Sequence, residues 1–148
     1  MIVSPRPFPG TCYLGHLIPV VRLLLVALFL AAGILHLRDP DLFLPLMPPW
    51  IPFHQACILL SGVCEILGAI GLLLPWRTVE LVAGWGLVLL LIAVFPANLH
   101  MALSHVRVHG FPAKPWMAWA RLPLQPILIV AVLWVTRAWS GICIKKGK

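Results

Sequence analysis

Hydrophobic residues along the chain gather into four long runs, separated by short stretches that hold most of the prolines and charges. The runs cover about residues 17–36, 54–74, 79–98 and 122–140. Each run is close to the ~20 apolar residues that a helix needs to cross the hydrocarbon core of a bilayer. Inside lipid, helices satisfy their own backbone hydrogen bonds. The pattern therefore predicts an all-α fold, a four-helix transmembrane bundle.

The connections predict how these helices pack. Pro75–Thr78 is so short a link that the second and third helices must pack as an antiparallel pair. Pro48–Pro52 favours turn or extended backbone just before the second helix. Pro96 lies near the end of the third run and leaves the carbonyl of Ile92 without its helical partner. Pro126 lies deeper in the fourth run, where it predicts a kink or a filled polar gap.

The two ends of the chain fall outside the runs. Residues 1–16 are rich in proline and predict a disordered or interfacial tail, or a start placed too far upstream. Residues 141–148 form a basic C-terminal tail. The first run, with Arg22 ahead of its apolar core, also resembles a cleaved signal peptide, but it lacks a clear A-x-A cleavage site. We therefore interpret residues 17–140 as one membrane domain.

Composition supports this class. Of the 148 residues, 61% are hydrophobic and 10% are charged, whereas a soluble domain carries about 25% charged residues. Too few polar residues are present to cover a water-facing surface, so a soluble globular enzyme is excluded.

The net charge of +7 raises the question of a nucleic-acid partner. The basic residues form no patch, and we expect no nucleic-acid binding. Those in the tails and the second connection are Arg6, Arg22, Arg77, Arg137, Lys145, Lys146 and Lys148. Those in the first and third connections are Arg38, Arg107, Lys114 and Arg121. By the positive-inside rule, the seven against four predict that the N and C termini are on the cytoplasmic side.

The second helix carries a line of small residues. Cys57, Ser61, Cys64, Gly68 and Gly71 follow a helical spacing, which predicts close packing against another helix. The chain has no C-x-x-C pair, no zinc-ligand spacing and no glycine-rich phosphate loop, so the sequence predicts no metal site.

Glu65 is the most informative single residue. It lies eleven positions after His54 and so near the middle of the membrane. A charge at that depth costs about 2.5 to 3.5 kcal/mol on insertion scales, and some interaction must offset the cost. Two interpretations stay open: a functional carboxyl, or a buried carboxyl that fixes the helix register.

The polar groups that could accompany Glu65 lie toward one face of the membrane. His36 ends the first helix, Asn98 and His100 end the third, and Arg121 and Gln125 begin the fourth. The pattern predicts a pocket open to the outer side with Glu65 at its floor. The residues predicted to bind a ligand are His36, Glu65, Asn98, Arg121 and Gln125. The alternative is that the residues of the rim lie at headgroup level only.

Five short strings resemble the DoxX-like family of small bacterial integral membrane proteins over about residues 20–139. They are Gly33–His36, Met47–Pro52, Ser61–Gly68, Phe95–Asn98 and Arg121–Gln125. The resemblance implies a four-helix protein of the bacterial cytoplasmic (inner) membrane. Several members of that family are linked to oxidoreductase systems, including a thiosulfate:quinone oxidoreductase subunit and a complex that handles oxidative and thiol stress.

Two functions follow as hypotheses. The first is an accessory, non-catalytic subunit of a membrane redox system, with a quinone in the pocket and an oxidoreductase as partner. The second is a non-redox binding or assembly module that holds a lipid, a small solute or a partner helix. The chain lacks the cysteine pair that a dithiol-exchanging relative needs, which argues against direct thiol chemistry.

Overall fold

The computed structural model describes residues 17–103 and 115–136, and these residues are helical almost throughout. The long helices are α2 (Leu17–Arg38), α3 (His54–Leu73), α4 (Arg77–Leu103) and α5 (Pro115–Val135). Two single turns of 3-10 helix, η1 (Pro40–Leu42) and η2 (Leu44–Leu46), lie between α2 and α3. No strand occurs in the described residues, so the predicted all-α class is confirmed.

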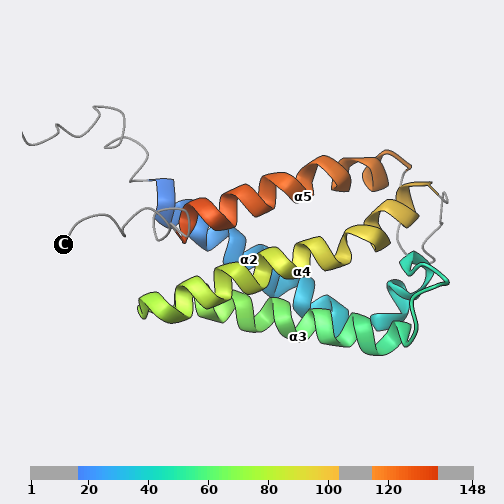
Figure 1. Cartoon of the computed structure of the whole chain (residues 1–148), viewed down its shortest axis with the longest axis horizontal. Coiled ribbons are helices and arrows are strands. Elements are labelled where there is room, and N and C mark those ends of the chain that lie inside the picture. The colour runs from blue at the N-terminus through green and yellow to red at the C-terminus, as the bar shows by residue number, and fades with distance from the viewer. Residues whose placement is uncertain (1–16, 104–114, 137–148) are drawn as a thin grey trace, which may run out of the picture.

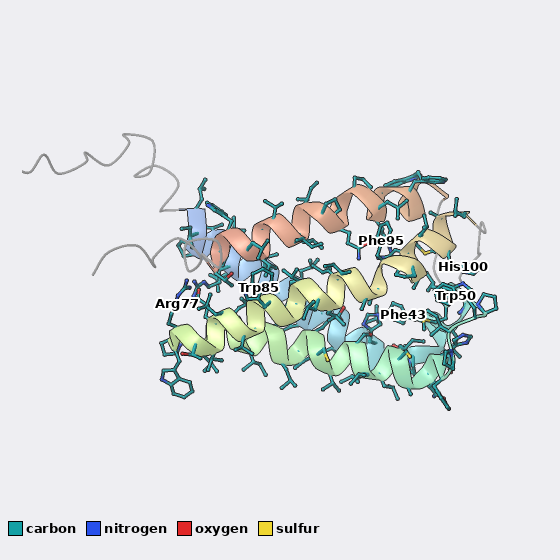
Figure 2. All side chains as sticks on the ribbon, in the orientation of Figure 1. Phe43, Trp50, Arg77, Trp85, Phe95 and His100 are labelled. Carbon is teal, nitrogen blue, oxygen red and sulfur yellow. The ribbon has the colours of Figure 1, made fainter. Side chains whose placement is uncertain are left out.

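The helices run alternately up and down, as Figure 1 shows. Each helix packs against the next along the chain, and α2 also contacts α5, which closes a ring of four. One end of the bundle holds η1, η2 and the start of α5, and we call it the loop end. The other end holds Arg22 and Arg77, and we call it the arginine end. Figure 2 shows Arg77 at one end and Trp50 and His100 at the other.

The observed helices differ from the expected runs mainly at the loop end. Helix α4 continues through Pro96 to Leu103, five residues beyond the predicted limit of 98. Helix α5 begins at Pro115 rather than near residue 122, because a proline in the first turn loses no helical hydrogen bond. The predicted tails at 1–16 and 141–148, and the final residues of the fourth run, lie outside the described residues.

The outward faces of the helices are apolar. Leu24, Leu89 and Ile127 are more than 60% exposed. By length and composition, α2, α3 and α4 are suited to crossing a membrane, and in α5 the apolar stretch covers Trp119–Val135. These properties are typical of helices that face lipid rather than water.

Close packing between α2 and α3 depends on two glycines. A Cβ atom on Gly33 would lie 2.7 Å from the carbonyl oxygen of Gly62, and one on Gly62 would lie 2.8 Å from the Cβ of His36. The two backbones therefore touch where these residues cross, which is how small residues bring membrane helices together. The crossing fixes which side chains of α2 and α3 face each other one turn further along.

The predicted line of small residues on α3 packs as expected only in its second half. A Cβ on Gly68 would strike Leu87 of α4, and one on Gly71 would strike Ala83. Cys64, in the first half, is instead exposed. The two helices are in tight contact toward the arginine end, and the first half of the line faces the cavity described below.

The main apolar core also lies in the half of the bundle toward the arginine end. Its buried members are Leu25, Val26, Phe29, Ala69, Leu72, Leu87, Val88, Leu91, Val132 and Val135. All four helices contribute, so this half is filled by side chains.

Candidate functional site

A cavity of about 580 Å³ lies in the half of the bundle toward the loop end. All four helices and the loop between α2 and α3 line it. All five residues predicted to bind a ligand are among the lining residues: His36, Glu65, Asn98, Arg121 and Gln125. The structure thus brings together residues that lie up to 89 positions apart in the sequence (125 − 36). Their role in binding stays a prediction.

The loop between α2 and α3 contributes to the lining in a way that the sequence did not suggest. Phe43, Leu46, Met47 and Ile51 all face the cavity, and Leu46 is buried. The loop is held down because the Nε2 of His54 donates a hydrogen bond of 3.0 Å to the carbonyl of Pro48. The sequence predicted a pocket that is open at this end, whereas these apolar side chains cover part of the loop end of the bundle.

His36 and Glu65 form the polar contact between α2 and α3. The Nδ1 of His36 lies 2.9 Å from the Oε2 of Glu65, and both side chains are largely shielded, at 16% and 12% exposure. The imidazole ring also packs on Phe43, with ring centroids 4.1 Å apart. The crossing at Gly33 makes this contact possible, because His36 lies one turn beyond it. Glu65 therefore has a partner, as the cost of a carboxyl at this depth requires.

Gln125 and Asn98 form a second polar contact, between α5 and α4. The Nδ2 of Asn98 donates a 3.3 Å hydrogen bond to the Oε1 of Gln125. The side chain of Gln125 is 4% exposed and donates in turn to the backbone carbonyl of Leu91. That carbonyl lies one residue before Ile92, whose helical donor is missing because of Pro96. Gln125 thus supplies a donor in the part of α4 that the proline disturbs.

Arg121 differs from the other four lining residues. Its side chain reaches the cavity from α5. Within the described part of the chain, no hydrogen bond or ion pair involves this guanidinium. It is the charged group of the lining whose donors are not used by other described residues.

His100, expected near the rim, is not part of the lining. Its Nδ1 is buried without a hydrogen-bond partner among the described residues.

A cluster of charges at the arginine end was missed by the sequence analysis. The Nη2 of Arg22 lies 2.5 Å from one carboxylate oxygen of Glu80, and the Nη1 of Arg77 lies 3.1 Å from the other. Arg22 also donates to the backbone carbonyls of Leu72 and Val135, at 3.3 and 3.4 Å. The cluster ties the start of α2 to the ends of α3 and α5 and the start of α4.

Two signals could have predicted this cluster. Glu80 is one of only four acidic residues in the chain. It also lies three residues after Arg77, which places both on one face of a helix. Arg22 and Arg77 were used only to predict the orientation in the membrane, so their ion pairs with Glu80 were not predicted.

The described residues contain no group of three or more His, Cys, Asp or Glu side chains close enough to hold a metal ion. The polar groups in the cavity are hydrogen-bond donors and acceptors. Their arrangement consists of two internally bonded pairs and one cation.

Comparison with family models places residues 25–136 in a domain family of unknown function, DUF8561, and the chain belongs to that family. No curated protein matches the chain significantly. No solved structure does so either. The matched region covers nearly all of the bundle, including the five lining residues.

Proposed function

We propose that this protein is a multi-pass membrane protein that binds a lipid-soluble molecule with a polar head inside its helical bundle. The observation that carries the proposal is the 580 Å³ cavity, whose lining is mostly apolar and contains five predicted polar residues. Sites for small molecules have this character: volumes of about 300 to 1,000 Å³, apolar walls and a few polar groups that orient the ligand.

The setting of the bundle supports a ligand that is drawn from the membrane. Three helices are long and apolar enough to cross a bilayer, and the outer faces of the bundle are rich in exposed leucine, isoleucine and valine. The excess of basic residues in the tails and second connection favours both termini in the cytoplasm. The resemblance to DoxX-like proteins favours the bacterial inner membrane.

A blocking variant tests the proposal. Ala32 on α2 lines the cavity, whereas Ala27 on the same helix points outward. Ala32→Trp should fill part of the cavity, and Ala27→Trp provides a control with the same change in composition. Each protein is extracted in mild detergent, and the organic extract is analysed by mass spectrometry.

We expect a small molecule to be retained by the wild type and by Ala27→Trp and to be depleted in Ala32→Trp. Equal amounts in all three extracts, or no small molecule in any extract even after incubation with membrane lipids, would contradict a binding cavity.

A quinone-linked accessory subunit is the second candidate, and the contact between His36 and Glu65 favours it. A hydrogen-bonded imidazole and carboxylate beside an apolar cavity can pass a proton to a bound quinone when that quinone is reduced by a partner enzyme. The resemblance to DoxX-like proteins, several of which are linked to such systems, supports the same candidate function.

The variant Glu65→Gln separates the two candidates. It keeps the shape of the side chain and its ability to hydrogen-bond His36 but removes the acidic proton. A quinone-linked subunit requires that the variant lower the rate of quinone reduction in membranes and that an oxidoreductase co-purify with the wild type. A binding module without electron transfer predicts an unchanged rate, with altered stability or partner retention.

A further inference from the structure

We propose that the molecule in this cavity carries an anionic head, a carboxylate or a phosphate, that Arg121 holds, while its apolar tail passes out between the helices into the bilayer. The inference rests on the proposed function and names the ligand class for the same site. The argument follows from the charges in the lining, the donors already in use and the exposed part of the wall.

Of the two charged side chains in the lining, Glu65 and Arg121, only Glu65 has a partner among the described residues. The carboxylate of Glu65 has a partner, because His36 lies 2.9 Å from it. Arg121 has no carboxylate of the described segments within the 4 Å that would define an ion pair. The cavity therefore contains a cation without a counter-charge in contact from the part of the chain that the structure describes.

The other polar side chains of the lining each make at least one hydrogen bond within the protein. The amide of Gln125 donates to the carbonyl of Leu91, and Asn98 donates to Gln125. The hydroxyl of Ser61 donates to the carbonyl of Ile58 at 2.8 Å. A ligand head that needs strong donors finds them at Arg121. The planar guanidinium carries five N–H donors and binds the two oxygens of a carboxylate or phosphate side by side.

Arg121 is exposed on the surface of the bundle and also lines the cavity, so its guanidinium can contact a head group that enters from the loop end. Leu124 and Leu128, which follow Arg121 on α5, line the same cavity. An anionic head would neutralise Arg121 at this place, whereas the neutral ring of a quinone would not. The cavity thus favours an acid over a neutral molecule of equal length.

Part of the cavity wall lies at the outer surface of the bundle. Leu60 is 64% exposed and Cys64 is also exposed, and both line the cavity from α3. Ala93 on α4 is exposed as well. The first half of the line of small residues on α3 therefore borders an opening between α3 and α4. Through this opening a tail longer than the cavity can extend among the lipids.

The proposal is tested with the full chain reconstituted in phosphatidylcholine nanodiscs. The probes are spin-labelled stearate and its methyl ester, which share one tail and differ in the charge of the head. We expect stearate to bind roughly tenfold to a hundredfold more tightly than the ester, the range that corresponds to one charge-assisted hydrogen-bonded contact.

Two variants isolate the role of Arg121. Arg121→Gln should remove most of the preference for stearate over its ester, and Arg121→Lys, which keeps the charge but loses the paired donors, should retain part of it. Arg38→Gln is the control, because Arg38 is an arginine of the same end that lies outside the cavity and is highly exposed. It should leave the preference unchanged.

Competition identifies the source of the anion. Acetate and inorganic phosphate added in excess should not displace the labelled stearate if the ligand is a membrane amphiphile. Displacement by either would assign the site to a water-soluble anion and overturn the tail part of the proposal.

The remaining outcomes separate the inference from the proposed function. Equal affinity of stearate and its ester, unaffected by Arg121→Gln but abolished by Ala32→Trp, would overturn the anionic head and keep a binding cavity. Binding of neither probe, or binding that Ala32→Trp does not reduce, would contradict both.

Discussion

Replacing Gly33 with alanine should force α2 and α3 apart and weaken the contact on which the candidate site depends. The new Cβ would lie 2.7 Å from the carbonyl oxygen of Gly62 and 2.8 Å from the Cγ1 of Ile66. Ile66 can turn its side chain away, but the carbonyl moves only with its helix. Ordinary contact begins at 3.4 Å, so the backbones must separate by about 0.7 Å (3.4 − 2.7).

The magnitude follows from two terms. Overpacking in a close contact costs about 1 to 3 kcal/mol. A separation of 0.7 Å would also stretch the 2.9 Å contact between His36 and Glu65 to about 3.6 Å (2.9 + 0.7), beyond hydrogen-bonding distance. Loss of that bond adds about 1 kcal/mol. We expect Gly33→Ala to lower the free energy of unfolding by about 2 to 4 kcal/mol.

The measurement is reversible unfolding in mixed detergent micelles, followed by tryptophan fluorescence. Gly86→Ala is the matched control, because a Cβ at Gly86 meets no atom within 4 Å. That variant should be as stable as the wild type or slightly more so, since alanine favours the helix. Equal midpoints for Gly33→Ala and Gly86→Ala would refute the close crossing and, with it, the geometry that brings His36 to Glu65.

Three further predictions concern other parts of the bundle. Glu65→Leu should lower the free energy of unfolding by about 1 to 3 kcal/mol because it leaves the shielded Nδ1 of His36 without its partner, whereas Glu65→Gln should cost less in the same assay. Glu80→Gln should lower it by about 1 to 3 kcal/mol because Arg22 loses its carboxylate, and the loss should shrink at high salt; an effect independent of salt would contradict the ion pair. Cys64 should not react with a charged maleimide in intact membranes and should react once denaturant exposes its thiol to water, where the reactive thiolate forms, as shown by loss of that label in Cys64→Ser; fast reaction in intact membranes would place this side chain in water rather than lipid.

Much of the fold followed from the sequence because hydropathy reports position along the axis of a helix. The limits of α3 differ from the expected 54–74 by one residue. The positions of His36, Asn98 and Gln125 along their helices were enough to predict that they lie at the same depth in the membrane, since antiparallel helices with short connections bring one end of each to the same level. Their common cavity is a consequence of that level together with their inward direction.

What the sequence did not predict depends on rotation about each helix axis and on the loop. Cys57, Cys64 and Gly68 share one face of α3, yet only the last is packed, because α3 and α4 touch toward one end and not the other. The apolar side chain of Phe43 belongs to a loop whose path is set by tertiary contacts, including its ring contact with His36. No periodic pattern over so few residues reports such a path.

The network of Arg22, Glu80 and Arg77 has a consequence for how the bundle can move. It anchors all four helices at one extremity, while the opposite extremity contains a hollow rather than a filled core. Helix α4 is 27 residues or about 40 Å long, so a tilt of about 3° about the anchored extremity displaces the other by about 2 Å. A tilt of this size would widen the cavity while leaving the contacts of Arg22, Glu80 and Arg77 intact.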